Sequence, residues 1–368
     1  MALIPHSSLL IPHSSFNMNI EVKTWGKTPD GKDIKLYTIT NSNGIKVQLS
    51  DIGAGIVSIF TPDRNGVFHD IVLGYPDPLS YYGDGPCAGK IPGRFANRIE
   101  NGKFKIDDVE YQLDLNTSDG KHHLHGGPIG FANQKWCSRI EGESVVFTYL
   151  SADGEAGYPG EMVAKARYTL NDENELNLRL GAWTTATTIV NLTNHTYFNL
   201  KGEGHGDILD HRLRLHASRW LPATNELITT GEMDPVADTP MDFTEGKLIG
   251  SDIREPFPAL IYGKGYDSCW VLDNLGKDKL NLAAELSHDG SGRMVQLYTT
   301  QPGIQVYTGN WLSGCPQGKN GHVYHDYEGV ALECQALPDS PNKPNFPNTF
   351  LRPGDEYKEI IIFKFSTI

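Results

Sequence analysis

Short runs in which apolar and polar residues alternate recur along almost the whole chain. The alternation has a period of two, which is typical of antiparallel strands with one buried and one solvated face. The clearest strand-like runs cover residues 34–40, 145–150, 162–170, 176–180, 295–299 and 360–365. No long window has the 3.6-residue period of an amphipathic helix, and no β–α–β rhythm is present. The pattern therefore predicts an all-β protein, built as a large antiparallel β-sandwich or barrel.

Glycine and proline punctuate the chain densely and leave little room for long helices. The 39 glycines and 22 prolines together make up about one residue in six. No linker or shift in composition divides the chain, so we expect a single domain over residues 19–368. Residues 1–17 contain a near-duplication of the motif LIPHSS, whose prolines interrupt every apolar stretch. We expect residues 1–18 to be a disordered leader or a misassigned start; a weak targeting segment is the alternative.

The charge balance and the cysteine pattern narrow the range of partners and locations. The 32 Lys and Arg residues against 45 Asp and Glu residues give a formal net charge of −13. Such an acidic chain is a poor match for nucleic acid or for an anionic membrane, since both attract basic surfaces. No apolar stretch reaches the length of about 18 residues that predicts a membrane span. The five cysteines include no CxxC pair, which favours reduced thiols in a cytoplasmic protein.

Three histidines in the segment KHHLHGGPIGF are the first candidates for chemistry. His122, His123 and His125 could bind a metal, but their spacing is not that of a helical zinc-binding pair and no nearby cysteine completes a ligand set. The two glycines after His125 predict a turn that lets backbone or ligand approach closely. His125 would then face a cleft; solvated loop histidines are the alternative.

Two further residues, His195 and Glu333, have the properties of an acid–base pair. His195 lies in the strand-like segment NLTNHTYFNL, and imidazole titrates near neutral pH. Glu333 follows three apolar residues in GVALECQALPDSPN, and Gln335 shares its face of the predicted strand. The alternatives are a structural histidine in a strand and a carboxylate that points outward to solvent.

Polar and aromatic side chains elsewhere could complete a site for a sugar. Asn97 and Arg98 in GRFANRI offer a fork of donors to hydroxyls or carboxylates, with a surface arginine as the alternative. Asp242 in TPMDF adds an acceptor, and Gln305 in PGIQVYTGN adds an amide. The aromatic side chains that could stack on a sugar ring are Phe131, Trp270, Tyr307 and Trp311. No motif for a phosphate loop, pyridoxal phosphate or flavin accompanies them, so we expect no cofactor.

In this order along the chain, these segments resemble the aldose 1-epimerase (galactose mutarotase) family. The matching motifs are GRFANRI (93–99), LHGG (124–127), TNHTYFNL (193–200), the MDF segment at Asp242, PGIQVYTGN (302–310), LECQALPDSPN (332–342) and LRPGDEY (351–357). NHTYFNL and the string LECQ–PD–PN are the most specific of these. The fold that the resemblance implies is a single large antiparallel β-sandwich, the galactose mutarotase-like supersandwich. That fold agrees with the alternation of the predicted strands.

The resemblance also implies a reaction and a role for each matching residue. It makes His195 the acid and Glu333 the base of a reaction that interconverts the α and β anomers of free hexoses such as galactose and glucose. It assigns substrate binding to Asn97, Arg98, His125, Tyr197, Asp242 and Gln305, with His125 also assisting catalysis. It implies a monosaccharide as the substrate, no metal, and a monomer or weak dimer.

The implied chemistry sets one requirement and leaves alternatives open. His195 must be protonated while Glu333 is ionised, an arrangement that their mutual attraction would favour. Ser268 follows Asp267 where family members often have histidine, and Ala132 stands where many have aspartate; both departures bear on the choice of sugar. The alternatives are an epimerase of a different or phosphorylated sugar, a non-catalytic sugar-binding protein, and a glycosidase that uses Glu333 and Asp242 as its carboxylate pair.

Overall fold

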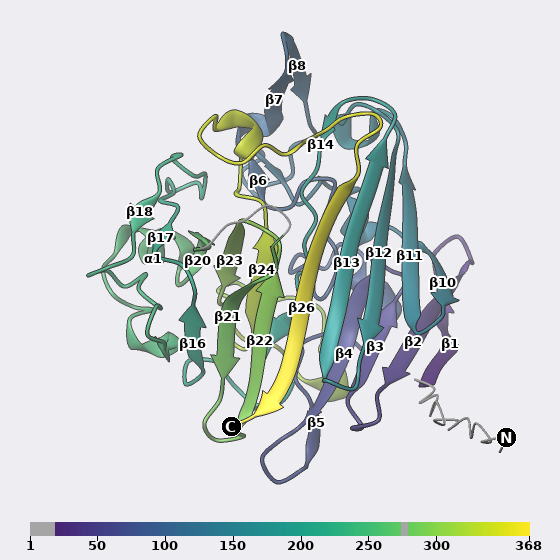
Figure 1. Cartoon of the computed structure of the whole chain (residues 1–368), viewed down its shortest axis with the longest axis vertical. Coiled ribbons are helices and arrows are strands. Elements are labelled where there is room, and N and C mark those ends of the chain that lie inside the picture. Colours follow the sequence, from purple (N-terminus) through teal and green to yellow (C-terminus); the bar gives the residue numbers. More distant parts are fainter. Residues whose placement is uncertain (1–18, 274–278) are drawn as a thin grey trace, which may run out of the picture.

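Strands make up most of the regular structure in the computed structural model, which describes residues 19–273 and 279–368 (Figure 1). The predicted leader at residues 1–18 lies outside the described residues. In the part of the chain that is described there is one α-helix, α1 (Pro258–Gly263). No helix in that part is long and apolar enough to cross a membrane.

Three antiparallel sheets carry the architecture. The five-stranded sheet has the order β1 (Asn19–Lys27), β2 (Asp33–Thr40), β3 (Lys46–Ser50), β4 (Gly55–Pro62), β5 (Phe68–Asp70). The nine-stranded sheet has the order β10 (Cys137–Glu141), β11 (Ser144–Ser151), β12 (Met162–Leu170), β13 (Glu175–Thr184), β26 (Tyr357–Thr367), β22 (Arg293–Thr299), β21 (Asn281–Ser287), β16 (Arg212–Leu215), β19 (Lys247–Leu248). The six-stranded sheet has the order β15 (Tyr197–Phe198), β24 (Val330–Gln335), β23 (Gly303–Tyr307), β20 (Asp267–Val271), β17 (Arg219–Trp220), β18 (Asp234–Pro235).

Smaller elements decorate these sheets. Three two-stranded sheets pair β6 (Arg98–Ile99) with β9 (His123–Leu124), β7 (Lys103–Ile106) with β8 (Val109–Gln112), and β14 (Thr188–Ile189) with β25 (Phe350–Leu351). The short 3-10 helices are η1 (Pro78–Tyr81), η2 (Glu100–Gly102), η3 (Phe131–Asn133), η4 (Glu155–Gly157), η5 (Ile249–Ser251), η6 (Lys319–Gly321) and η7 (Ser340–Asn342). The β7–β8 hairpin projects from one end of the molecule (Figure 1).

The three large sheets enclose one apolar core, so the predicted β-sandwich is confirmed. A bridge between Val72 and Phe198 links the five-stranded sheet to the six-stranded sheet, and together they face the nine-stranded sheet. Ile56, Leu178 and Leu332 come from the three different sheets and lie in the same cluster of buried residues. The alternation that predicts this arrangement is complete in β12, where every second side chain is buried.

All six strand-like runs identified from the sequence lie within strands of the structure. They correspond to β2, β11, β12, β13, β22 and β26, and β12 begins and ends at the predicted residues. The structure extends the other five by one to five residues, because residues beyond the predicted ends still pair with the neighbouring strands.

The strand-like segment 191–200 is mostly irregular, and only β15 within it forms a named strand. Side chains satisfy backbone groups that a sheet would otherwise pair. Thr193 Oγ1 donates to the carbonyl of Cys334, and Asn194 Nδ2 donates to the carbonyl of Gly89. Such bonds offer the chain an alternative to a regular ladder. These bonds hold the segment at the edge of the six-stranded sheet, where β15 pairs with β24 and His195 lies beside β24.

Candidate active site

One face of the six-stranded sheet carries a row of polar side chains. Leu332 and Cys334 of β24 point into the core, so Glu333 between them points to the opposite face. Glu333 is the register partner of Gln305 on β23, which in turn pairs with Cys269 on β20. Two residues before Cys269, Asp267 occupies the same face. Antiparallel register therefore assembles a carboxylate, an amide and a second carboxylate from three strands.

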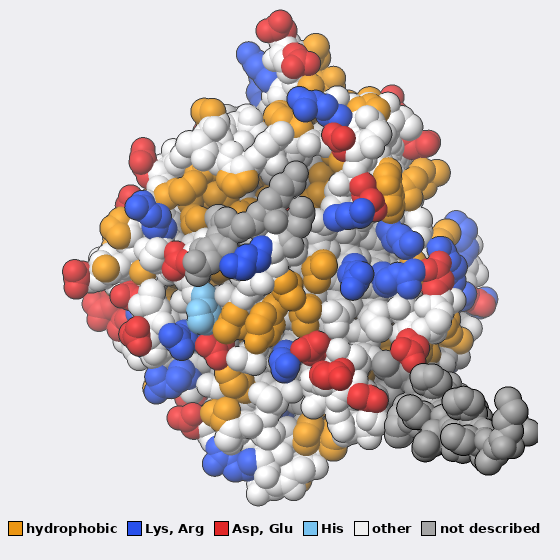
Figure 2. Space-filling model, in the orientation of Figure 1, with side chains coloured by type: hydrophobic (Ala, Val, Ile, Leu, Met, Phe, Trp, Pro, Cys, Tyr) orange, Lys and Arg blue, Asp and Glu red, His pale blue; other side chains and the backbone are white. Residues whose placement is uncertain are grey.

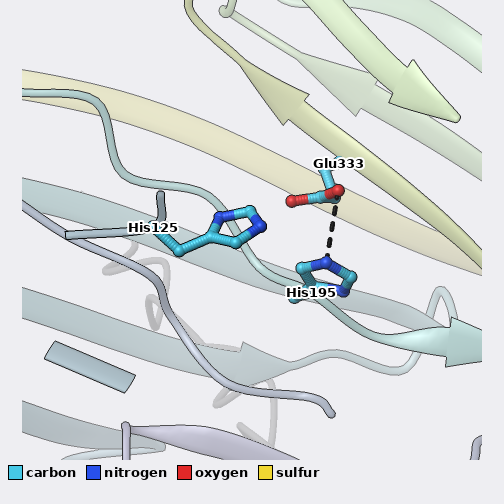
Figure 3. Close-up of side chains that lie close together, drawn as sticks. All are labelled: His125, His195 and Glu333. Atoms are coloured by element: carbon cyan, nitrogen blue, oxygen red, sulfur yellow. Dashed lines mark ion pairs between the residues drawn. The ribbon is translucent and has the colours of Figure 1, made fainter. Parts of the chain in front are cut away.

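His195 completes a pair with Glu333. It lies two residues before Tyr197, whose register partner on β24 is Ala331, two residues before Glu333. The period of two thus puts His195 on the face of Glu333, and the atoms His195 Nε2 and Glu333 Oε1 are 3.5 Å apart (Figure 3). Both side chains are almost fully buried.

The backbone of His195 is held by a neighbouring segment. Its N–H donates to the carbonyl of Lys90 at 2.9 Å, and its carbonyl accepts from the N–H of Gly89. The side chain of Lys90 forms a buried ion pair with Asp84, with Nζ and Oδ1 separated by 2.6 Å, and also donates to the carbonyl of Tyr81. This buried pair anchors the segment that holds the backbone of His195.

We expect Lys90→Met to destabilise the fold, because it leaves the Asp84 carboxylate buried without a counter-charge. The free energy of unfolding, measured by urea denaturation, should fall by about 3–5 kcal/mol. The double variant Lys90→Met/Asp84→Asn should recover part of this loss, since the unpaired charge is gone. Equal stability of the single variant and the wild type would contradict the assignment of a buried pair.

His125 enters the site from a separate element. It follows β9 with φ of +52°, and its ring lies 5.3 Å from the ring of His195, centroid to centroid (Figure 3). The glycines after it permit the close approach that the sequence predicts. A Cβ at Gly126 would lie only 1.7 Å from the carbonyl oxygen of Gly93, so no other residue fits there.

The tautomer of His125 follows from its hydrogen bond. The backbone N–H of Asn97 donates to His125 Nδ1 at 3.1 Å, so this nitrogen accepts. Burial, and after it electrostatic repulsion from His195 and Arg98, holds the pKa of His125 well below its usual range. The neutral ring therefore carries its hydrogen on Nε2, and it presents a donor.

Burial moves both members of the acid–base pair toward their neutral forms. Desolvation raises the pKa of Glu333 well above its usual range; the charge of Asp267 adds to this rise, and Arg98 opposes it. Desolvation lowers the pKa of His195 to about 4, with Lys90 acting in the same direction. The expected ion pair is therefore not the favoured form of the unliganded site. The pair still shares one proton, which burial places on Glu333 rather than on His195.

Several buried polar atoms converge here without a hydrogen-bond partner. Within residues 19–273 and 279–368 they include His195 Nδ1, Glu333 Oε2, Gln305 Oε1 and both side-chain polar atoms of Gln335. Buried polar groups are nearly always paired, and exceptions call for a functional explanation. Hydroxyl groups of a bound molecule would satisfy them.

A cavity adjoins Glu333 through Gln305. Its lining consists of Asn97, Arg98, Leu221, Ala223, Leu227, Thr229, Asp267, Ser268, Cys269, Gln305 and Pro338. Three residues predicted from the sequence, Asn97, Arg98 and Gln305, are thus brought together. Ser268 also lines this cavity, whereas Ala132 lies buried in η3 between Phe131 and Asn133. Of the two departures from the family pattern, Ser268 is the one that borders the cavity.

Asp267 is a site residue that the sequence alone does not single out. Gln305 Nε2 donates to Asp267 Oδ1 at 2.7 Å, which leaves Gln305 Oε1 as an acceptor. The signal in the sequence is its strand, DSCWV, but only the register with β23 brings Asp267 to Gln305.

Asp242 lies in a turn outside β20. Its carboxylate accepts from the N–H and the hydroxyl of Thr244, and Thr244 is also what lowers the pKa of Asp242 most. The neighbouring carbonyl of Met241 accepts from the indole N–H of Trp270 in β20. The hydrogen bonds described for Asp242 thus stay within its turn, and its assignment to substrate remains a prediction.

The predicted aromatic residues divide into two groups. Trp270 and Phe131 are buried in the core, so the prediction that they stack on a sugar is wrong. Tyr197 packs 4.9 Å from the ring of His195, and its hydroxyl donates to the carbonyl of Pro86. Tyr307 lies on the polar face between Tyr197 and Trp311, and Trp311 is 42% exposed.

Two clusters have the residue types of a metal site, but their hydrogen bonds disfavour ligation. His125, His195 and Glu333 bring one ligand atom each within 4.8 Å of one another, as do Asp119, His122 and Glu226. In the first cluster the Nε2 of neutral His125 carries a hydrogen. In the second, the N–H of Asn101 donates to His122 Nδ1, and Lys121 already pairs with Glu226. A metal would have to displace these hydrogens and this cation.

Comparisons with known proteins identify the family to which the chain is similar. Residues 35–364 match the family model described as aldose 1-epimerase. Galactose mutarotase from Homo sapiens is 39% identical over 93% of this chain and 97% of its own length. Aldose 1-epimerase from Escherichia coli is 36% identical over 92% of this chain and 96% of its own. The solved structure of galactose 1-epimerase from Lactobacillus acidophilus superposes with a TM-score of 0.82 at 27% identity, covering 95% of this chain and 99% of that one.

Proposed function

Since this chain belongs to the aldose 1-epimerase family, we propose that it interconverts the α and β anomers of free hexoses such as galactose and glucose. The observation that carries the proposal is the pair of buried titratable groups, His195 and Glu333, with 3.5 Å between Nε2 and Oε1. A shared proton beside a cavity with unsatisfied polar atoms is what a reversible double proton transfer needs.

The reaction requires one base and one acid, and no net change in protons. Glu333 takes the proton from the C1 hydroxyl while His195 gives a proton to the ring oxygen, and the bond from C1 to the ring oxygen breaks. Rotation about C1–C2 turns the aldehyde over. The ring then closes on the other face as each proton returns along its path. Each transfer contributes about 10²–10⁴-fold to the rate.

The reactive protonation state has to be reached from the neutral pair. Moving the shared proton from Glu333 to His195 produces the carboxylate base and the imidazolium acid together. Arg98 favours this form because its charge lowers the pKa of Glu333. Donors from sugar hydroxyls to Glu333 would favour the carboxylate further.

His125 and the cavity residues are proposed to hold the sugar. The Nε2–H of His125 would donate to an oxygen of the ring without competing for the proton that His195 transfers. Gln305 Oε1, fixed by the bond from Nε2 to Asp267, would accept from a hydroxyl. Asn97, Arg98 and Tyr197 would line the sugar, and Asp242 is retained as a further proposed contact.

Polarimetry of freshly dissolved α-D-galactose and α-D-glucose tests the proposal. The protein should accelerate the approach to equilibrium above the spontaneous rate, and the ratio of rates would rank the sugars. No acceleration with either sugar would refute the activity on these hexoses. An assay for newly released reducing ends would then detect a glycosidase, and calorimetry would detect sugar binding without turnover.

We expect kcat/KM to follow a bell-shaped pH profile with a low acid limb. Below a pH of about 4 the pair takes up a second proton, so that His195 and Glu333 are both protonated and no base remains. Above the raised pKa of Glu333 the pair loses its only proton, so no acid remains. Asp267→Asn removes a charge that raises this pKa, and it should shift the alkaline limb to lower pH. A shift to higher pH in that variant would contradict the assignment.

Three further expectations remain proposals. The acidic charge and the five free cysteines are consistent with a cytoplasmic protein. Burial raises the pKa of Cys87 and of Cys334 to about 12, which leaves both as unreactive thiols. A single domain over residues 19–368 and a monomer or weak dimer are the expected organisation.

A further inference from the structure

A second pocket lies on the outer face of the nine-stranded sheet, on the side of the sandwich away from Glu333. Leu178 and Leu180 of β13 point into the core, so Arg179 and Gly181 point outward. The pocket has a volume of about 260 Å³. We call it the outer pocket. It is lined by Lys165, Arg167, Arg179, Leu180, Gly181, Trp183, Glu356, Lys358, Glu359 and Ile360.

The register of three strands explains the shape of the outer pocket. Gly181 on β13 is paired with Lys165 of β12 on one side and with Lys358 of β26 on the other. A Cβ at Gly181 would be in ordinary van der Waals contact with two ring carbons of Trp183, at 3.5 and 3.8 Å, and with the backbone oxygen of Tyr357 at 3.7 Å. The glycine therefore forms a flat floor between two lysines, where the lack of a side chain leaves room for the indole of Trp183.

Positive charge dominates this floor although the whole chain is acidic. Lys and Arg side chains gather over β12 and β13 on the face shown in Figure 2. Arg167 is paired with Glu141, and Lys358 with Glu356. Over residues 19–273 and 279–368, no ion pair is described for Lys165 or Arg179. The charge of Lys165 acts on Glu141, and Glu356 and Glu359 also line the pocket, so its lining holds four cations against two carboxylates.

Trp183 adds an apolar wall to the charged floor. The indole is 39% exposed, so part of its aromatic surface is accessible to a ligand. Aromatic faces stack on the C–H face of sugar rings, whereas Lys and Arg hold phosphate groups. The pocket lies at the small end of ligand-binding volumes, which suits one ring with one phosphate better than a nucleotide.

We propose that the outer pocket binds a small phosphorylated sugar. The phosphate would lie beside Gly181 among Lys165, Lys358 and Arg179, and the sugar ring would rest against the exposed part of Trp183. The cavity beside Glu333 has a different character, since Arg98 is the one cation among its lining residues. A phosphorylated sugar is therefore expected in the outer pocket and a neutral sugar at the active site.

Isothermal titration calorimetry with glucose 6-phosphate, inorganic phosphate and glucose tests the proposal on the intact protein. Glucose 6-phosphate should bind more tightly than inorganic phosphate, and its affinity should fall as salt is added. An excess of galactose in the cell should not weaken the binding of glucose 6-phosphate. Competition by galactose would place the ligand at the active site and overturn the proposal. Binding to anionic lipid vesicles without binding of glucose 6-phosphate would also overturn it.

Variants separate charge from shape. Gly181→Ile fills the floor without changing any charge and should abolish binding, while mutarotation by the same sample reports that it is folded. Arg179→Glu should weaken glucose 6-phosphate by about tenfold or more, and Arg254→Glu, at an exposed arginine outside the pocket, should leave it unchanged. Trp183→Ala should weaken glucose 6-phosphate but not inorganic phosphate. Full binding in both Gly181→Ile and Arg179→Glu would overturn the proposal.

Discussion

The Glu333→Gln variant is expected to lose about 10²–10⁴-fold in kcat for mutarotation. Glutamine preserves the size of the side chain, and it still reaches His195 and Gln305 from β24. It cannot take a proton from the C1 hydroxyl, so the chemical step loses its base. Substrate contacts from other strands remain, and calorimetry with galactose should show an affinity close to that of the wild type.

A matched control separates loss of the base from loss of the fold. Glu328 is also a buried glutamate, but its carboxylate pairs with His322 away from the active site. Glu328→Gln should therefore retain the wild-type rate even if its thermal stability is lower. A Glu333→Gln variant with nearly the wild-type rate would remove Glu333 from the role of base.

The His195→Gln variant is expected to lose kcat by a similar factor of about 10²–10⁴. The amide of glutamine can reach the position of Nε2 and donate a hydrogen bond, but it cannot give up a proton to the ring oxygen. Since burial lowers the pKa of His195 to about 4, the wild-type imidazolium is a strong acid once it forms. The loss should thus appear in kcat much more than in KM, as measured by polarimetry over a range of sugar concentrations.

The two losses should not add. Glu333 and His195 share one proton and act as a unit, so the double variant should be no slower than the worse single variant by more than a few fold. His216→Asn provides the control. His216 is a partly exposed histidine that pairs with Glu285 of the nine-stranded sheet, whereas Glu333 belongs to the six-stranded sheet. A double variant whose losses multiply fully would show that the two residues act independently.

The fold could be predicted because its cause is local in the sequence. A period of two over five to ten residues can only be buried on one side by a sheet, and β12 shows the complete pattern. The segment 191–200 shows the limit of this reasoning. Its residues alternate like those of a strand, but Asn and Thr side chains replace the ladder with their own bonds.

The site could be predicted in part, because a resemblance carries residue types but not their surroundings. His125, His195 and Glu333 do converge, and Asn97, Arg98 and Gln305 line one cavity. Asp267 is not identified from the sequence, since only the pairing of β20 with β23 brings it to Gln305. Trp270 and Phe131 are aromatic residues of the right type, but the core buries them.

The sequence by itself determined the all-β architecture and the acidic character of the chain, and it singled out His195 and Glu333 as candidates for an acid–base pair. Each of these depends on residue type and spacing, which are visible without coordinates. Only the tertiary structure decided how the two groups are solvated, and burial raises the pKa of Glu333 and lowers that of His195 against their mutual attraction. It alone placed Lys165 and Lys358 on either side of Gly181, since strand register joins residues almost two hundred positions apart. Solvation and register are properties of the folded chain, and no local pattern encodes them.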